Sequence, residues 1–212
     1  MGLPLPRLYV ILDAALVREP VLGLAEQLID AGVRLLQYRD KTGTAATTLR
    51  TSKALAHIAR KSGATFFVND RPDIAFLAGA SGVHVGQDDL NVEQARAIVG
   101  RDRWVGVSTH NPEQFTEAVA TSADYIAIGP IFPTTSKSNP DPVVGTELIS
   151  RLRSLTDKPI VAIGGIRLEQ AESVLQAGAN SVAVISDILL APNPGERAAQ
   201  CVRRLDAVEL HR

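Results

Sequence analysis

The sequence has a single cysteine, almost no net charge and no long uncharged apolar run. One thiol, Cys201, cannot form a disulfide within the chain, which excludes a disulfide-stabilised scaffold. The 22 Lys and Arg residues nearly balance the 23 Asp and Glu residues, so no overall field attracts nucleic acid or an anionic membrane surface. We therefore predict no nucleic-acid partner, and any affinity for phosphate must come from local groups.

A membrane span is also missing from the sequence. Its uncharged apolar runs stay well short of the roughly 20 residues that cross a bilayer. The first six residues contain no basic segment ahead of such a run, as a secretory signal would. These absences predict no membrane partner and residence in the cytoplasm.

Eight short aliphatic runs alternate with segments of helical spacing. The aliphatic runs, which we predict to be strands, cover residues 8–12, 33–37, 65–68, 83–85, 104–107, 125–128, 159–163 and 181–185. The predicted helices cover residues 19–30, 44–61, 72–78, 92–99, 145–155, 168–176 and 195–208, and one more begins at Pro112.

This alternation predicts one α/β domain over residues 1–212. Continuous aliphatic strands are typical of a parallel sheet covered on both faces. Dividing 212 residues among eight units gives about 26 for each, near the minimum for a strand, a helix and two loops. We therefore predict a closed (β/α)8 TIM barrel forming a single catalytic domain. An open doubly wound sheet is the alternative, but Asp13-Ala14-Ala15 stands where its glycine-rich turn would follow the first strand.

Polar side chains gather where the predicted strands end. In a TIM barrel, the carboxyl ends of the strands and the loops after them build the active site. The second strand leads into Gln37, Arg39 and Lys41, which share one face because side chains alternate along a strand. Taken alone, the two cations also suit an ion-paired or solvated rim.

Acidic residues follow two neighbouring strands. Asn69 and Asp70 come after the third strand, and Gln87, Asp88 and Asp89 come after the fourth. Carboxylates from adjacent strands repel each other unless a cation lies between them, and Mg²⁺ suits one or two carboxylates plus substrate phosphates. Capping of the following helices is the alternative role for Asp70 and Asp89.

The histidines allow more than one interpretation. His110 follows Ser108 and Thr109 at the end of the fifth strand, and an imidazole suits a general acid or base. It equally suits a cap for the helix that begins at Pro112. His84, inside the fourth strand, and His57, inside a helix, are predicted to be packed or hydrogen-bonded side chains rather than ligands.

Two stretches suit phosphate groups. The loop after the sixth strand offers three hydroxyls and an ammonium, from Thr134, Thr135, Ser136 and Lys137, although an ordinary surface loop has a similar composition. Gly164-Gly165 and Ile185-Ser186 follow the seventh and eighth strands, where barrels commonly hold a phosphate on backbone N–H groups. Two anion sites and a metal between the acids suggest two phosphorylated substrates.

Seven short motifs extend over nearly the whole chain. They are QYRDK at 37–41, FFVNDRPDIA at 66–75, GVHVGQDDL at 82–90, GVS at 106–108, GPIFPTTSK at 129–137, AIGGI at 162–166 and VAVIS at 182–186. Each motif alone is weak, but all seven together are highly specific. In order and spacing they resemble the thiamine phosphate synthase family.

The resemblance implies a Mg²⁺-dependent transferase. That family joins 4-amino-2-methyl-5-hydroxymethylpyrimidine pyrophosphate to 4-methyl-5-(2-hydroxyethyl)thiazole phosphate, giving thiamine phosphate and pyrophosphate by dissociative substitution at the pyrimidine methylene. For this sequence it implies that Gln37 orients the pyrimidine and that the pyrophosphate is bound by Arg39, Lys41, Asn69 and Lys137. It further implies Mg²⁺ ligands at Asp70 and Asp89, and thiazole phosphate contacts at Thr134, Ser136, Gly165, Ile185 and Ser186. The implied catalytic residues are Lys137, Ser108 and Arg39.

Two other functions stay open on the same barrel. A thiazole tautomerase-like isomerase would use His110 as its proton carrier and would not need the pyrophosphate and metal groups. A non-catalytic barrel that binds thiamine phosphate is the second alternative. The small-molecule substrates are the expected partners, and the sequence is also compatible with a homo-oligomer.

Overall fold

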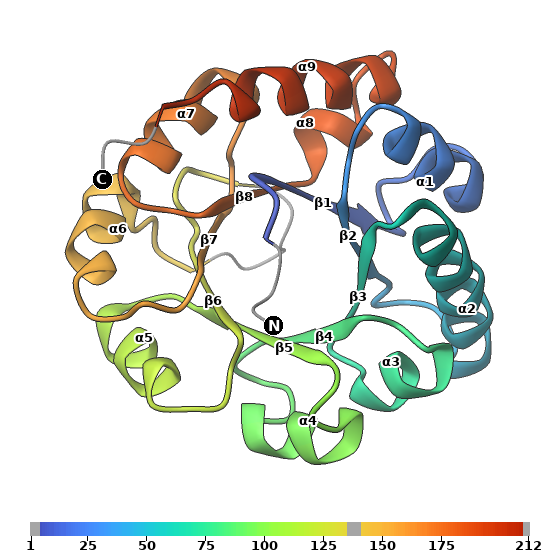
Figure 1. Ribbon diagram of the computed structural model, residues 1–212, viewed down its shortest axis with the longest axis horizontal. Helices are drawn as coiled ribbons and strands as arrows, with labels where there is room; N and C mark the ends of the chain where they lie inside the picture. Colours follow the sequence, from blue (N-terminus) through green and yellow to red (C-terminus); the bar gives the residue numbers. More distant parts are fainter. Residues whose placement is uncertain (1–4, 135–140, 210–212) are drawn as a thin grey trace.

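The computed structural model describes residues 5–134 and 141–209, and eight parallel strands form a closed barrel at its centre (Figure 1). The strands are β1 (Leu8–Asp13), β2 (Leu35–Arg39), β3 (Thr65–Asn69), β4 (Gly82–Val85), β5 (Trp104–Thr109), β6 (Tyr125–Ile128), β7 (Ile160–Ile163) and β8 (Ser181–Val184). Each strand pairs with the next, and β8 closes the ring against β1 with Val182 opposite Leu8. The predicted (β/α)8 barrel is therefore confirmed, and the open sheet is wrong.

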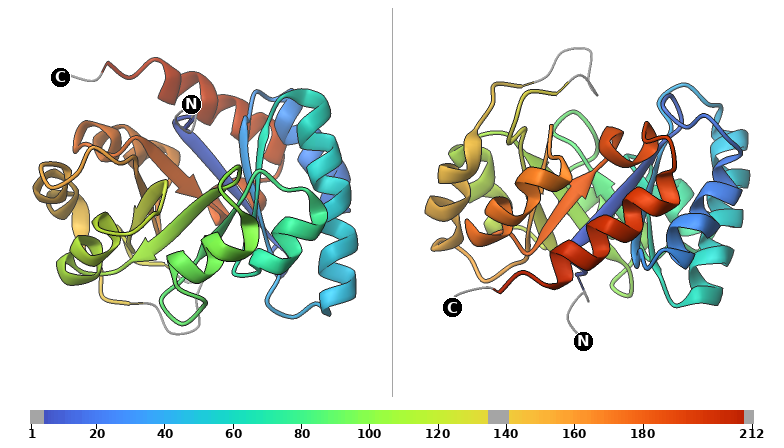
Figure 2. Two further views of the ribbon diagram at one scale, coloured as in Figure 1. Left: turned by 60° about the horizontal axis from the view of Figure 1, so that its bottom comes forward. Right: turned by 90° about the horizontal axis from the view of Figure 1, so that it is seen from above.

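Helices surround this barrel (Figure 1). They are α1 (Val21–Asp30), α2 (Ala45–Ser62), α3 (Pro72–Ala78), α4 (Val92–Val99), α5 (Pro112–Val119), α6 (Gly145–Arg153), α7 (Leu168–Gln176), α8 (Ser186–Leu189) and α9 (Pro194–Asp206). Figures 1 and 2 show α9 beside both α7 and α1, so the last helix closes the outer ring next to the first. Within the described ranges, none of these helices has both the length and the apolar character to cross a membrane.

The strands carry apolar side chains on both faces. Along β1, Tyr9 and Ile11 point into the barrel, whereas Leu8, Val10 and Leu12 pack outward against the helices. The interior is filled by Tyr9, Ile11, Leu35, Phe67, Tyr125, Ala127, Val161 and Ala183. Burial on both faces explains why the strands read as continuous apolar runs instead of alternating ones.

The short helix α8 was not predicted from the sequence. Its four residues are too few to show a helical repeat of apolar positions. Ile185 precedes it with φ −119° and ψ −85°, so β8 ends at Val184, and the prediction that the strand includes Ile185 is wrong.

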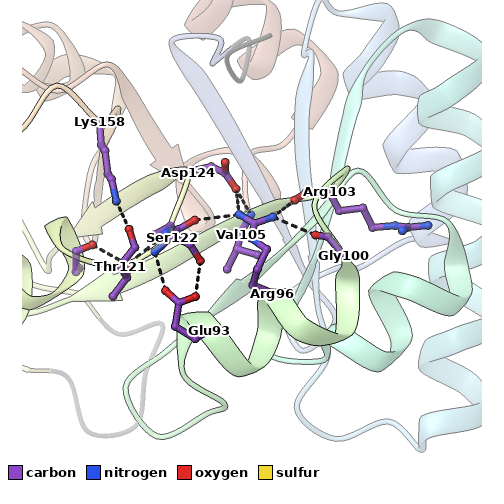
Figure 3. A network of polar contacts seen from close by, with 11 residues as sticks. Glu93, Arg96, Gly100, Arg103, Val105, Thr121, Ser122, Asp124 and Lys158 are labelled. Atoms are coloured by element: carbon purple, nitrogen blue, oxygen red, sulfur yellow. Dashed lines mark hydrogen bonds and ion pairs between the residues drawn. The ribbon is translucent and has the colours of Figure 1, made fainter.

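A network of polar contacts ties α4 to the amino ends of β5 and β6 (Figure 3). Arg96 donates to the carbonyl oxygen of Ser122 at 3.0 Å and to the carboxylate of Asp124. The same carboxylate accepts from the backbone N–H of Val105 at 2.7 Å. Glu93 accepts from the backbone N–H of Ser122 at 2.8 Å and from its hydroxyl at 2.9 Å. This network lies at the amino ends of the strands, opposite the carboxyl ends that carry the predicted site residues. Residues at this end of a barrel contribute to stability.

Candidate active site

A pocket opens at the carboxyl ends of the strands, and all eight strands contribute to its wall. The predicted substrate-binding residues in this wall are Gln37, Arg39, Asn69, Ser108, Thr134, Gly165, Ile185 and Ser186. Its floor is apolar and includes Ala127, Val161 and Ala183. Gln37 and Ser186, far apart in the sequence, thus share one pocket because the barrel closes.

Gln37 and Arg39 are each held by another side chain. The buried carboxamide of Gln37 donates from Nε2 to the hydroxyl of Tyr9 at 2.7 Å. The guanidinium of Arg39 pairs with the carboxylate of Asp13, which lies opposite it in the paired strands β1 and β2. Asp13 Oδ1 also accepts from the backbone N–H of Ala15 at 3.0 Å. A guanidinium has five N–H donors, so this pairing leaves donors for an anion in the pocket.

The acidic residues do not cap the helices that follow them. Asn91 caps α4 by accepting from the backbone N–H of Gln94, and the N-cap residue of α3 is Arg71, without a side-chain cap. The capping alternative for Asp70 and Asp89 is therefore wrong. Asp70 has φ 61° and is the only described residue other than glycine with a positive φ. This sparsely populated conformation is typical of functional sites.

Asp70 and Asp89 lie side by side, as predicted for carboxylates on neighbouring strands. Asp70 pairs with the ammonium of Lys41, and Asp89 Oδ2 accepts from the backbone N–H of Gly86 at 2.8 Å. Burial and the hydrogen bond with Asp70 raise the pKa of Asp89 above its ordinary value.

The two carboxylates of Asp70 and Asp89 fit Mg²⁺, which keeps water and substrate ligands, better than they fit a metal ion whose ligands all come from the protein. Among the described residues, no group of three or more His, Cys, Asp and Glu side chains is arranged to hold a metal ion. Mg²⁺ is commonly bound by one or two carboxylates, with waters and substrate phosphates completing its shell. Asp70 and Asp89 supply that pair at the edge of the pocket wall, next to Asn69.

His110 lies in the pocket wall and does not cap α5. Its Nδ1–H donates to the carbonyl oxygen of Gly129 at 2.6 Å, and its Nε2 lies 3.5 Å from Asp141 Oδ2. The cap of α5 is Asn111, which accepts from the backbone N–H of Gln114, so the capping alternative for His110 is wrong.

His84 and His57 behave differently from each other. His84 is buried and hydrogen-bonded through both ring nitrogens, which confirms the prediction of a satisfied side chain, and it also lines the pocket. Its Nε2 lies 2.8 Å from the hydroxyl oxygen of Ser108. His57 was predicted to be packed or hydrogen-bonded, and because it is exposed on α2, packing is wrong.

The loops after β6 and β7 touch closely. The N–H of Phe132 donates to the carbonyl oxygen of Gly164 at 3.0 Å. Gly164 and Gly165 have φ 96° and 67°, and a Cβ at Gly165 would lie 2.4 Å from the carbonyl oxygen of Pro133. Glycine is therefore required for this contact. It brings Thr134 into the same wall as Gly165. Ser136 and Lys137 lie outside the described residues, and their roles stay predictions.

A family model described as thiamine monophosphate synthase matches residues 8–188. The chain belongs to this family. It is 51% identical over 209 residues to the thiamine-phosphate synthase of Koribacter versatilis, covering 96% of this chain and 98% of that protein. It is 43% identical to the thiamine-phosphate synthase of Chlorobium phaeovibrioides, covering 95% of each. Its structure resembles thiamine phosphate pyrophosphorylase from Pyrococcus furiosus with a TM-score of 0.87, 31% identity and coverage of 95% of this chain and 96% of that one.

Membership of the thiamine monophosphate synthase family confirms the resemblance seen in the sequence motifs. Residues around the pocket that were not predicted from the sequence include Asp13, Tyr9 and Tyr125. Asp13 ends β1 and could have been found by the strand-end rule that selected Arg39. Tyr9 and Tyr125 lie inside strands, where their hydroxyls carry no signal that separates them from ordinary core tyrosines.

Proposed function

We propose that this chain condenses the pyrimidine pyrophosphate with the thiazole phosphate to form thiamine phosphate and release pyrophosphate. The observation that carries the proposal is that two groups of residues suited to anions lie on different sides of the barrel. The acidic pair Asp70 and Asp89 lies with Lys41 and directly follows the pocket residue Asn69 of β3, whereas the glycine-rich wall at Gly165 follows β7. Two separate anion sites suit two phosphorylated substrates.

Substitution at the pyrimidine methylene begins with loss of pyrophosphate. The bond from the methylene carbon to the pyrophosphate oxygen breaks, its electron pair leaves with the oxygen, and amino donation from the ring stabilises the electron-poor methylene. In this chain, Gln37 orients the pyrimidine, and Arg39, Lys41, Asn69 and Lys137 bind the leaving group. These cations and donors stabilise the charge that develops on the departing oxygen.

Asp70 and Asp89 would hold Mg²⁺ beside the pyrophosphate. When bound there, the ion stabilises the negative charge of the leaving group. Lys41 pairs with Asp70, so its ammonium can contact the same pyrophosphate as the metal ion.

The thiazole nitrogen then forms the new C–N bond to the methylene carbon. Thr134, Ser136, Gly165, Ile185 and Ser186 bind the thiazole phosphate and so fix the distance between the two rings. The apolar pocket floor excludes water, which would otherwise capture the methylene. No enzyme nucleophile is needed, and burial raises the pKa of the Cys201 thiol on α9 to about 11, which makes it a poor one.

The product assay tests this function. Purified protein is incubated with both substrates, and thiamine phosphate and pyrophosphate are followed together with and without Mg²⁺. We expect equal, metal-dependent formation of both products and no reaction with either substrate alone. Thiazole tautomer conversion without thiamine phosphate formation would favour the isomerase, and tight binding of thiamine phosphate without turnover would favour a binding protein.

We place this activity in the cytoplasm with small-molecule substrates as its partners.

A further inference from the structure

A chain of hydrogen bonds crosses the interior of the barrel beneath the pocket. Gln37 Nε2 donates to Tyr9 Oη at 2.7 Å, and Tyr9 Oη lies 3.1 Å from Tyr125 Oη. Tyr125 Oη lies 2.8 Å from His84 Nδ1, and His84 Nε2 lies 2.8 Å from Ser108 Oγ. The chain thus connects the predicted pyrimidine contact Gln37 with the predicted catalytic hydroxyl of Ser108.

Packing fixes the middle of this chain. The Tyr125 ring stacks on the His84 ring at a centroid distance of 5.5 Å and meets Phe67 edge-on at 5.6 Å. A Cβ at Gly106 would lie 2.0 Å from Tyr125 Cζ, so the ring fits only because residue 106 is glycine. Tyr125 and Tyr9 are almost fully buried, and their hydroxyls have little room to move.

Only one donor-to-acceptor order along these hydrogen bonds gives both tyrosine hydroxyl protons an acceptor. Because Tyr9 already accepts from Gln37, its own proton goes to Tyr125, whose proton then goes to His84 Nδ1. In the opposite direction Tyr9 would accept twice, and its buried proton would have no acceptor among the described residues, which is costly. Burial raises the pKa of both tyrosines, which keeps the hydroxyl protons in place.

This direction determines what Ser108 offers to the pocket. If Nδ1 of His84 accepts, its ring proton is on Nε2 and is donated to Ser108 Oγ. The hydroxyl proton of Ser108 is then available to an oxygen that becomes more negative during the reaction. With the other tautomer, that proton would be held by His84, and the oxygen lone pairs would face the developing charge.

We propose that Tyr125 is a positioning residue that holds His84 in its Nε2–H tautomer, so that Ser108 donates its hydroxyl proton to the reacting substrate. Tyr9 supports the same arrangement and anchors the carboxamide of Gln37. The proposal rests on the proposed function and adds residues that touch neither substrate phosphate.

The variant Tyr125→Phe tests this role because it removes the hydroxyl and keeps the ring. We expect kcat to fall by about tenfold to a hundredfold, the value of one hydrogen bond to a charged group, with little change in KM for either substrate. In a Ser108→Ala background, the same substitution should cause almost no further loss, because Tyr125 acts through Ser108. The matched control is Tyr38→Phe. The hydroxyl of Tyr38 donates to Asp40 and takes no part in the hydrogen bonds between Gln37 and Ser108, so this variant should keep the wild-type kcat.

Nitrogen-15 NMR of histidine-labelled protein measures the tautomer directly, with His84 assigned by comparison with His84→Gln. We expect a protonated Nε2 and an unprotonated Nδ1 in the wild type and a population of Nδ1–H in Tyr125→Phe. The Tyr9→Phe variant keeps the link from Tyr125 to His84, so it should retain the tautomer and raise KM for the pyrimidine substrate.

Three results would overturn the proposal. They are an Nδ1–H tautomer of His84 in the wild type, an unchanged kcat in folded Tyr125→Phe, or a loss of kcat in the Tyr125→Phe, Ser108→Ala double variant that equals the product of the two single losses. A wild-type protein that forms no thiamine phosphate would instead remove the proposed function, and the NMR measurement would still decide the direction of the chain.

Discussion

Single residues behind the pocket wall determine where its charges point. Arg39 faces the pocket, and the carboxylate that pairs with it belongs to Asp13, which is almost fully buried. Because Asp13 is held by the backbone N–H of Ala15, it can fix the guanidinium in one orientation. An arginine positioned in this way binds an anion without first losing side-chain freedom.

Asp13→Asn tests this arrangement. The substitution keeps the shape of the side chain and removes the charge, so Arg39 loses its ionic partner. We expect KM for the pyrimidine pyrophosphate to rise about tenfold and the free energy of unfolding to fall by about 2 kcal/mol. Steady-state kinetics and urea unfolding measure the two effects.

The control for Asp13→Asn is Glu172→Gln, which removes a carboxylate from an exposed ion pair with Arg204. Exposed pairs contribute little, so both quantities should change hardly at all. An unchanged KM in Asp13→Asn would show that Arg39 does not depend on Asp13 for its orientation.

The strand-end rule predicted several polar residues of the pocket, among them Gln37, Arg39 and Asn69. It could not predict the contacts behind them. Tyr9 and Tyr125 are separated by 116 residues, and Tyr125 and His84 by 41, so only closure of the barrel brings their hydrogen-bonding atoms together. Such pairings depend on register and side-chain direction, which apolar spacing does not specify.

At the scale of elements, the proposed thiazole phosphate site depends on how the loops after β6 and β7 fit together. Gly165 allows the carbonyl oxygens of Phe132 and Pro133 to approach its Cα, and Ile131 N–H donates to the carbonyl oxygen of Ile163 at 2.9 Å. The loop that carries Thr134 is therefore placed by β7.

Gly165→Ala should displace that loop. The added methyl group would lie 2.4 Å from the carbonyl oxygen of Pro133, and alanine is strained at φ 67°. We expect KM for the thiazole phosphate to rise at least about tenfold, with a smaller change for the pyrimidine pyrophosphate. Equal changes in both KM values would contradict a separate thiazole phosphate site.

Gly63→Ala is the matched control for backbone strain. Gly63 ends α2 with φ 72°, and nothing lies within 4 Å of a Cβ built there. This variant should lose about 1 kcal/mol of stability and keep the wild-type kinetics. Comparison of the two variants separates the clash at Gly165 from the strain that both share.

The sequence predicted most elements because their repeats are long enough to detect. The apolar repeat of the predicted helix 44–61 corresponds to α2, and Thr44 caps it by accepting from the backbone N–H of Thr47. Two boundaries differ from the prediction: the first helix begins at Val21 instead of Glu19, and α6 ends at Arg153 instead of Leu155. These ends are set by tertiary contacts and local caps instead of apolar spacing.

At the scale of the whole molecule, the two ends of the barrel have different tasks. The carboxyl ends of the strands carry the pocket, and the amino ends of β5 and β6 carry the network around Arg96 (Figure 3). Lys158, before β7, joins this network by donating to the carbonyl oxygen of Thr121. The network can therefore be weakened without changing the chemistry.

Arg96→Met removes the donors that bind Ser122 and Asp124 and keeps much of the aliphatic side chain. We expect a loss of about 2 to 3 kcal/mol in the free energy of unfolding, because a partly buried carboxylate and carbonyl lose their partner. The kcat and KM values should stay at wild-type levels. The control Arg101→Met changes an exposed arginine and should shift stability by no more than about 0.5 kcal/mol. A loss of activity at temperatures where Arg96→Met is fully folded would contradict the separation of the two ends.

The most direct test of two separate anion sites is a crystal structure with thiamine phosphate, pyrophosphate and Mn²⁺ in place of Mg²⁺. Anomalous scattering should place the metal between Asp70 and Asp89, with the pyrophosphate on the side of Arg39 and Lys41. The phosphate of thiamine phosphate should lie on the wall formed by Gly165 and Ser186. A metal bound elsewhere, or pyrophosphate bound at Gly165, would contradict this assignment.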